Sequence, residues 1–308
     1  MLTHSVLATL AAFSACTDLP VPVGDITSPQ AWGDAFLAKY AEERVIGELE
    51  PGPPPLAQPR TVLLITGVTI PAVWFDPIVA RLERDGFRPV VYEPPDLLSG
   101  DLFEHSHALA AVVERVRAES GEDKIDILAE CTGGLIARHY IQALGGDQYV
   151  SRLVTFISPQ RGLPKASLAA GIVGWPALDD LTPGSEFLET VNSAPLPAAV
   201  AVTSIYTCTD EYIQPYKTSI IPGATNIGLC DGFVGHFQFF YDPAIYLVMH
   251  GALVAPVAAD PDGPADGDPA APASPTDGGG CAVGGGSTGG AGLLALGALL
   301  VRLRRRRS

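Results

Sequence analysis

Strand-like and helix-like segments alternate along the middle of this chain, and this alternation constrains its fold more than any other feature. Short apolar runs typical of buried strands cover residues 61–66, 89–92, 125–129, 153–158, 199–206 and 225–229. Between them lie segments with apolar residues at helical spacing. Parallel strands that are covered by helices on both faces are apolar along their whole length. The sequence therefore predicts an α/β fold, a single domain built on a doubly wound, mostly parallel sheet.

The N-terminal part of the 308-residue chain precedes this alternating region. Residues 1–16 are uncharged and apolar and end in small residues, which is typical of a signal peptide. Cys16 is a candidate for lipidation, and a plain N-terminal helix is the alternative. A leading helix is expected over 31–50, before an α/β domain over 60–254. Within that domain, residues 162–197 are rich in small residues and proline and are expected to form a lid-like insertion.

The C-terminal part has a different composition. Residues 255–280 are dominated by Pro, Asp, Ala, Gly and Ser, and they are expected to form a disordered linker. Residues 281–308 begin at Cys281, continue as an apolar stretch and end in an arginine cluster. This order resembles the myxobacterial-type C-terminal sorting tail, which implies processing near Cys281; a simple membrane anchor is the alternative. Both interpretations predict an exported domain, secreted or held at the cell surface through its tail.

The charge of the chain is strongly acidic. There are 34 acidic and 19 basic residues, which give a formal net charge of −15. Five of the basic residues, Arg302 and Arg304 to Arg307, stand in the tail, so the remainder is more acidic still. A nucleic-acid-binding domain needs a basic patch, and the sequence has none. We expect no nucleic-acid partner.

The cysteines predict one free thiol. Cys16 and Cys281 belong to the two ends, which leaves Cys131, Cys208 and Cys230. Cys208 and Cys230 end two neighbouring strands of the expected sheet at the same edge. We expect a disulfide between them, with two buried thiols as the alternative. The disulfide would leave Cys131 unpaired.

Three loops after expected strands contain residues suited to nucleophilic catalysis. Ligands of a doubly wound sheet bind at the carboxyl ends of its strands. Cys131 follows one strand and precedes Gly133 and Gly134, a pattern typical of the strand-to-helix turn that presents a nucleophile. Asp210 follows the next-to-last strand and His236 follows the last. Nucleophile, acid and histidine thus occur in the order that hydrolases with such a turn use.

The segment from about residue 62 to 253 resembles the small lipases of the α/β-hydrolase superfamily, both bacterial class 2 triacylglycerol lipases and the fungal lipase B type. The resemblance rests on "ECTGGLIARHYIQALGGDQYVSRLVTFISPQRG", "LTPGSEFLETVN", "SIYTCTDEYIQPYKTSIIPGATNIGLCDGFVGH" and the double proline Pro94-Pro95. It implies the α/β-hydrolase fold. It also implies that Cys131 is the nucleophile, Asp210 the acid and His236 the base.

The sequence departs from the family pattern beside the nucleophile. Cys131 replaces the usual serine, and Glu130 replaces the usual histidine or aromatic residue. Val68 stands where some relatives have a hydroxyl that assists the oxyanion, so the oxyanion hole is expected to consist of the backbone N–H groups of Val68 and Thr132. A carboxylate near the thiol would raise its pKa. The effect of Glu130 therefore depends on the direction of its side chain.

The sequence predicts a carboxylic ester hydrolase, a lipase or esterase, that forms an acyl-enzyme on Cys131 and uses no cofactor. Its substrate would be a lipid or another ester. The alternatives are an acyltransferase with the same thioester intermediate and an inactive, lipase-like binding module. An acyl-binding wall is expected from four apolar residues of the insertion, Leu163, Leu168, Ile172 and Trp175. Four other histidines lie on expected helices without spaced acids or thiols, so we expect no metal site: His105, His107, His139 and His250.

Overall fold

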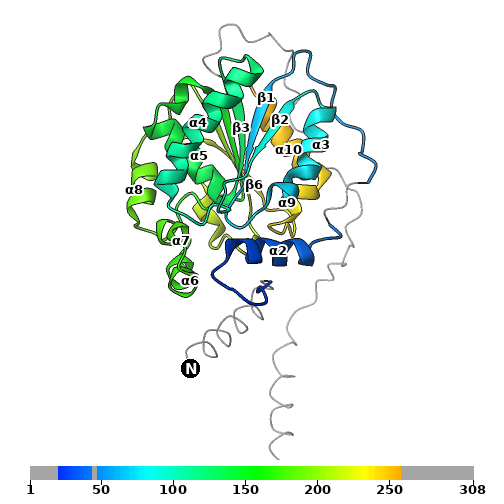
Figure 1. Ribbon diagram of the computed structural model, residues 1–308. Helices are drawn as coiled ribbons and strands as arrows, with labels where there is room; N and C mark the ends of the chain where they lie inside the picture. Colours follow the sequence, from blue (N-terminus) through cyan, green and yellow to red (C-terminus); the bar gives the residue numbers. More distant parts are fainter. Residues whose placement is uncertain (1–19, 44–46, 258–308) are drawn as a thin grey trace, which may run out of the picture. The chain divides into compact units, whose positions relative to one another are not determined.

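Six parallel strands form one sheet in the computed structural model, which describes residues 20–43 and 47–257 (Figure 1). Their order is β2-β1-β3-β4-β5-β6, and every neighbouring pair is parallel. The bounds are β1 Thr61–Ile65, β2 Arg88–Tyr92, β3 Ile125–Glu130, β4 Val150–Phe156, β5 Ala201–Thr207 and β6 Thr225–Leu229. The order reverses direction between β1 and β3, which is the position where doubly wound sheets bind ligands. The predicted fold class is confirmed.

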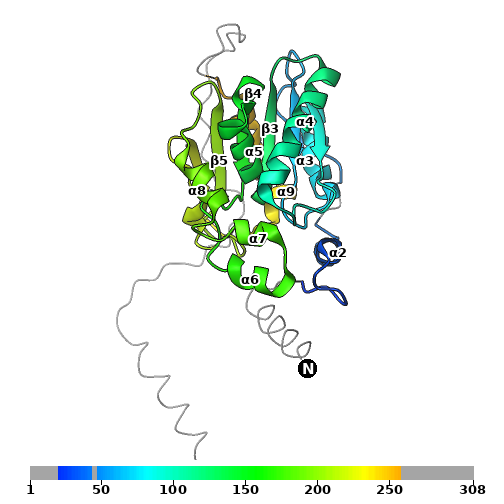
Figure 2. The same ribbon diagram turned by 60° about the vertical axis from the view of Figure 1, so that its left-hand side comes forward.

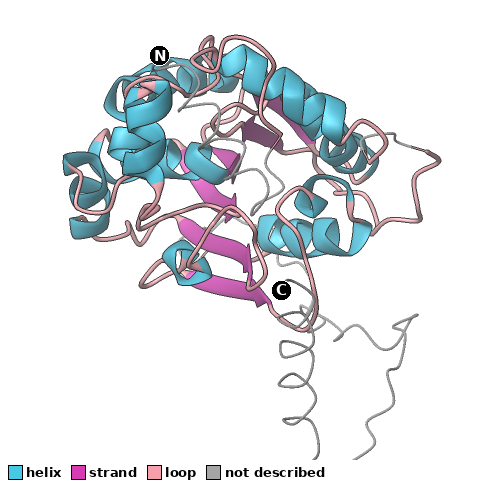
Figure 3. Cartoon of the chain, turned by 90° about the horizontal axis from the view of Figure 1, so that it is seen from below, coloured by secondary structure: helices cyan, strands magenta, loops and turns pink. Residues whose placement is uncertain are grey.

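Each face of the sheet carries its own apolar core, because successive residues of a strand point to opposite faces. In β1, Val62 and Leu64 belong to one core, whereas Leu63 and Ile65 belong to the other. The first core is covered by α3 (Asp76–Arg84), α9 (Gln238–Tyr241) and α10 (Pro243–Val254). The second is covered by α4 (Leu102–Ser120), α5 (Cys131–Ala143) and α8 (Glu186–Ser193). Figure 3 shows the strands between these two groups of helices.

The leading helix is shorter than the sequence predicts. α2 spans Pro29–Lys39 instead of 31–50, and the side chain of Ser28 caps its first turn by accepting a hydrogen bond from the Ala31 N–H. The helix ends where Tyr40 takes up a non-helical conformation and packs its ring against Phe237, with 4.3 Å between ring centroids. Further along the chain, Glu50 accepts two hydrogen bonds from the guanidinium group of Arg81, which lies on α3. Residues 47–50 are not helical, and Glu50 is held at α3 by these bonds.

The end of β4 also differs from the expected range of 153–158. The strand begins at Val150 and ends at Phe156, because Ile157 has a φ of 45° and cannot continue an extended strand. The Ile157 N–H still donates to the carbonyl of Ile205, 2.9 Å away, so the loop leaves the sheet next to β5.

The insertion contains three short helices. They are α6 (Ala166–Val173), α7 (Pro176–Asp180) and α8, and Figure 2 shows α6 and α7 together at the end of the domain where α2 also lies. Trp175, between α6 and α7, joins this region to the N-terminal segment, since its indole N–H donates to the carbonyl of Thr27 at 2.7 Å. The shorter turns are η1 (Ala72–Phe75), η2 (Gly146–Gln148) and η3 (Tyr216–Ser219). Movement of the insertion as a lid stays a prediction.

Several predicted segments lie outside the described residues. These are the signal peptide over 1–16, the linker after residue 257 and the tail over 281–308, with Cys16 and Cys281. Within the stretches 20–43 and 47–257, none of the helices combines the length and the apolar character needed to cross a bilayer.

Candidate active site

Cys131 occupies a sharp turn between β3 and α5. It is the first residue of α5 and has a φ of 44°, in the left-handed region that residues other than glycine rarely adopt. The glycines that follow allow the helix to start close to the sheet. A Cβ on Gly133 would lie 2.7 Å from the carbonyl oxygen of Thr66, and one on Gly134 would lie 2.7 Å from the hydroxyl of Ser158. The strand–turn–helix that the sequence predicts around Cys131 is present.

The acid and the histidine meet as a hydrogen-bonded pair. His236 Nδ1 lies 2.9 Å from Asp210 Oδ2, and both side chains are buried. The other carboxylate oxygen of Asp210 accepts hydrogen bonds from the N–H groups of Tyr212 and Ile213, at 2.8 and 2.7 Å. Burial alone would raise the pKa of Asp210, but His236 and these N–H groups lower it below its ordinary value. Asp210 is therefore a fixed carboxylate that orients the imidazole.

Two neighbouring acids have other positions. Glu211 accepts a hydrogen bond from the backbone N–H of His236 at 2.9 Å, so it holds the main chain of the loop instead of the ring. Asp231 is exposed. Of these acids, only Asp210 contacts the imidazole.

Glu130 points into the site. Its side chain is fully buried, and Oε2 accepts a hydrogen bond from the Gly67 N–H at 2.6 Å. Its other oxygen, Oε1, lies 3.5 Å from His236 Nε2, a distance at the outer limit of a hydrogen bond. A Cβ on residue 67 would stand 2.3 Å from Oε2, so a glycine there leaves the space that the carboxylate fills. The imidazole thus has a carboxylate at each of its two nitrogens.

This arrangement raises three pKa values. Burial raises the pKa of the Cys131 thiol, and the charge of Glu130 raises it further against the opposite effect of His236. Burial also raises the pKa of Glu130. Burial lowers the pKa of His236, but Asp210, with smaller contributions from Cys131 and Glu130, raises it well above its ordinary value. These shifts favour the thiol over the thiolate at Cys131 and the protonated over the neutral imidazole at His236.

The residues of the predicted oxyanion hole, Val68 and Thr132, are close in sequence to Gly67 and Glu130. Thr132 is the second residue of α5, where a backbone N–H has no acceptor within the helix and the helix dipole favours negative charge. Val68 directly follows Gly67, whose own N–H is already bonded to Glu130. The assignment of Val68 and Thr132 as donors stays a prediction.

A chain of polar side chains behind the turn was not predicted. The hydroxyl of Ser158 donates to the carbonyl of Cys131 at 2.5 Å, and the amide of Gln160 donates to that hydroxyl at 2.7 Å. The guanidinium of Arg138 in turn donates to Gln160 Oε1 at 2.9 Å. All of these residues are buried. The sequence signal was the set of polar residues directly after the buried strand β4.

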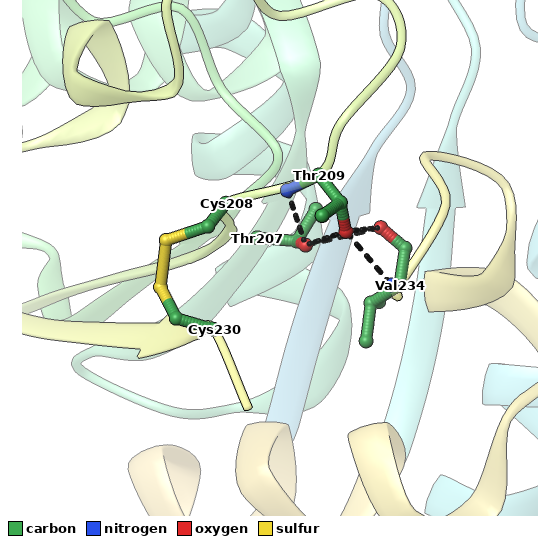
Figure 4. Close-up of a disulfide and its surroundings, with 5 residues drawn as sticks. All are labelled: Thr207, Cys208, Thr209, Cys230 and Val234. Carbon is green, nitrogen blue, oxygen red and sulfur yellow. Dashed lines mark hydrogen bonds between the residues drawn. A yellow bond between two sulfur atoms is a disulfide. The ribbon is translucent and has the colours of Figure 1, made fainter. Parts of the chain in front are cut away.

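The two loops that carry Asp210 and His236 are covalently joined. Cys208 and Cys230 form a disulfide with a Cα–Cα distance of 5.0 Å, which confirms the predicted pair, and Cys131 is the free cysteine of the described residues (Figure 4). Threonines add to this link. The hydroxyls of Thr207 and Thr209 both donate to the carbonyl of Val234 at 3.0 Å, and the Val234 N–H donates to the Thr209 hydroxyl at 2.9 Å.

The four residues of the expected acyl-binding wall do not share one surface. Leu163 packs against the core on the α5 face, whereas Ile172 and Trp175 belong to the core on the other face. Leu168 on α6 is 54% exposed. Trp175 packs edge-on against Trp32 with 6.1 Å between ring centroids. Their role in binding an acyl chain stays a prediction.

Comparison with known proteins identifies a lipase as a relative. The chain is 27% identical to Lipase B of Pseudozyma antarctica over 169 residues, which is 53% of this chain and 49% of that protein. The chain therefore spans about half the length of this relative. No protein-family model matches the sequence.

Solved structures share the fold. Lipase B of Aspergillus fumigatus superposes with a TM-score of 0.56 at 19% identity, covering 65% of this chain and 53% of that one. The mature form of the Bacillus licheniformis lipase BlEst2 superposes with a TM-score of 0.52 at 18% identity, covering 65% of this chain and 94% of the lipase. The α/β-hydrolase fold is confirmed, and over about half of its sequence the chain is lipase-like.

Proposed function

We propose that the protein is a carboxylic ester hydrolase, a lipase or esterase, that uses Cys131 as nucleophile, His236 as base and Asp210 as the acid that orients the base. The observation that carries the proposal is the Asp210-bound imidazole of His236, which has a ring nitrogen within 4.8 Å of the sulfur of a cysteine in a strand-to-helix turn. The similarity to Lipase B supports an ester substrate. A lipid ester is the substrate class that we favour.

In the first half of the reaction, the Cys131 thiol transfers its proton to His236 Nε2 while the sulfur attacks the carbonyl carbon. The N–H groups of Val68 and Thr132 would stabilise the resulting oxyanion. The carbon–oxygen bond of the ester then breaks, and His236 returns the proton to the departing alcohol. The acyl group is left on the sulfur as a thioester.

In the second half, His236 takes a proton from a water molecule, and the water oxygen attacks the thioester. The carbon–sulfur bond breaks, the sulfur regains the proton from His236, and the carboxylic acid leaves. Asp210 remains ionised throughout and stabilises the imidazolium that forms twice in the cycle. The sum of both halves is ester plus water giving acid plus alcohol.

Glu130 adds a condition to this cycle. The base must be neutral before it can accept the thiol proton, whereas carboxylates at both nitrogens favour a protonated imidazole. Glu130 lies 3.5 Å from Nε2, and burial raises its own pKa. We infer that the reactive form has the extra proton on Glu130, which leaves His236 free to act as the base.

The decisive experiment is hydrolysis of chromogenic esters of short and long acyl chain by the purified protein. Cys131→Ala and His236→Ala should each lower kcat/KM by at least about 10³-fold, since the members of a triad act as a unit. Asp231→Asn is the matched control, because Asp231 lies in the histidine loop but is exposed, and it should retain the activity. Turnover that is unchanged in both alanine variants would refute the proposed triad.

We further propose that the domain works outside the cytoplasm, anchored through residues 281–308. The acidic linker and the arginine-rich tail of the sequence support this location. Cell fractionation tests it: the full chain should sediment with membranes, and a chain without residues 281–308 should be found in the medium. Equal distribution of the two chains would contradict the anchor.

A further inference from the structure

We propose that Glu130, Cys131 and His236 together bind one divalent zinc ion. One oxygen, one sulfur and one ring nitrogen from these residues lie within 4.8 Å of one another, and all three residues are buried. The inference does not rest on ester hydrolysis, because it depends only on these three side chains. It also gives a role to both departures from the usual turn sequence, since Glu130 and Cys131 would each supply a metal ligand.

The geometry is close to that of a zinc site. Zinc bonds of about 2.0–2.3 Å arranged tetrahedrally place ligand atoms roughly 3.3–3.8 Å apart. Glu130 Oε1 and His236 Nε2 are 3.5 Å apart, which is within this range without movement. The Cys131 sulfur lies within 4.8 Å of both atoms, so it would have to approach by about 1 Å at most to reach this range. Three protein ligands would then leave one position for water or another small ligand.

One ligand atom has no other partner. Glu130 Oε1 is buried and accepts no hydrogen bond of normal geometry from the described residues, and it faces His236 Nε2 at 3.5 Å. The Gly67 N–H holds the other oxygen of the same carboxylate and thereby directs Oε1 toward His236. A cation between Oε1 and Nε2 would give this oxygen the close ligand contact that it lacks.

The charges match a divalent cation. A carboxylate and a thiolate carry two negative charges, and a neutral imidazole adds none, so a Zn²⁺ ion makes the buried group neutral. Sulfur and imidazole ligands select zinc over magnesium and calcium, which prefer oxygen. On binding, the Cys131 thiol and the imidazole at Nε2 release their protons to the solvent.

Each ligand also has a partner that orients it, as established zinc sites require. Asp210 accepts a hydrogen bond from the Nδ1 side of His236 at 2.9 Å, which leaves Nε2 as the metal-binding nitrogen. The hydroxyl of Thr132 lies 3.7 Å from the Cys131 sulfur. The carboxylate–histidine arrangement is therefore already in place.

Zinc binding and the proposed hydrolysis exclude each other. The metal would occupy both the sulfur that attacks the ester and the nitrogen that accepts its proton. We therefore expect zinc to act as a reversible inhibitor that a chelator removes. An ester hydrolase of this kind would be active only while the free zinc concentration is below the dissociation constant of the site.

Metal binding to the full-length, chelator-treated protein tests the proposal without an activity assay. Cobalt is the probe, because a four-coordinate Co²⁺ ion absorbs strongly in the visible region and a cobalt–thiolate bond adds a charge-transfer band in the near ultraviolet. One equivalent of Co²⁺ should produce both signals, and one equivalent of Zn²⁺ should abolish them. Competition against a chromophoric chelator then gives the affinity for zinc.

Variants identify the ligands. Glu130→Gln should weaken zinc binding by at least about 10-fold, and Cys131→Ser should remove the charge-transfer band. Glu114→Gln is the matched control, since Glu114 is an exposed carboxylate on α4, and it should bind zinc like the original protein. Circular dichroism checks that each variant is folded. If Glu130→Gln does not fold, Cys131→Ser tests the site instead, because serine fills nearly the same space as cysteine. The cobalt–thiolate charge-transfer band should then be absent in this variant.

Two results would overturn the proposal: the absence of both cobalt signals in the original protein, or equal zinc affinity in folded Glu130→Gln. Cobalt binding without ester hydrolysis would leave the metal site standing and refute only the proposed function. Ester hydrolysis without cobalt binding would leave the proposed function standing and refute only the metal site.

Discussion

Glu130 shows how one residue changes the chemistry of a strand-to-helix turn. Serine hydrolases need only a base and an acid beside the nucleophile, whereas this site has a second carboxylate at the other nitrogen of the imidazole. That carboxylate disfavours a negative charge on sulfur. The same residue therefore slows attack by the thiol and creates a set of metal ligands.

Replacing Glu130 should activate the thiol. Burial and Glu130 together raise the pKa of Cys131, while His236 lowers it and the Thr132 hydroxyl contributes little. Without the carboxylate, the thiolate–imidazolium pair is favoured, so Glu130→Gln should alkylate with iodoacetamide several-fold faster at neutral pH. The midpoint of its pH–rate profile should also shift to lower pH.

The measurement is alkylation kinetics in the presence of a chelator, with Asp231→Asn as the control. If Glu130→Gln reacts more slowly than the original protein, or with the same pH profile, then the charge of Glu130 does not control the thiol.

At the scale of elements, the acid loop and the histidine loop form one unit. The disulfide between Cys208 and Cys230 closes a loop with a sequence separation of 22 residues, and cross-links of this size contribute about 3 kcal/mol to stability. Replacing both cysteines with alanine should lower the free energy of unfolding by about 2–4 kcal/mol. Urea denaturation, followed by tryptophan fluorescence, measures the change.

The original protein under the same conditions, without a reducing agent, is the control for this double variant. An unchanged midpoint would mean that the threonine hydrogen bonds to Val234 hold the two loops without the disulfide.

A second link between elements predicts a pH dependence. Glu50 joins the N-terminal segment to α3 through two hydrogen bonds from Arg81, at 2.7 and 3.1 Å, and one from Arg84. The Arg81 guanidinium, opposed by burial and assisted by Arg84, lowers the pKa of Glu50 from 4.5 to about 2. A group whose pKa is lower in the folded state contributes stability above its unfolded pKa and loses it as the pH falls through the folded value.

The contribution of Glu50 should therefore be complete above about pH 4.5 and be lost toward about pH 2. Solvent screens this partly exposed carboxylate, so the effect should be about 1 kcal/mol. Thermal denaturation of Glu50→Gln from pH 6 to 2 should show a smaller loss of stability on acidification than the original protein. Parallel curves for the two proteins would contradict the assignment.

For the whole molecule, the sequence predicted the architecture well because each strand is apolar along its length. Five of the six strands were placed to within about two residues, whereas β4 begins three residues before its expected start; its end at Phe156 follows from the positive φ at Ile157, which nothing in the sequence indicated. The helix α2 was predicted too long, since its end depends on the packing of Tyr40 against Phe237. Such contacts between distant segments are not visible in local periodicity.

The same reason limited the prediction of the site. The chain order of Cys131, Asp210 and His236 could be read from the sequence, and the acid and histidine do meet. The inward direction of the Glu130 side chain could not be read from the sequence, because it depends on the space at Gly67, which is 63 residues away in the chain. The bond of Glu211 to the main chain of His236 could not be read from the sequence either.

The disulfide also has a consequence for when the site becomes complete. In a reducing cytosol the two thiols would stay apart, and the loops that carry Asp210 and His236 would be joined by hydrogen bonds alone. On the proposed function and location, the acid and its histidine become locked together only once the chain has left the compartment in which it is made. Synthesis and activity are then separated in time, which protects the lipids of the producing cell from its own hydrolase.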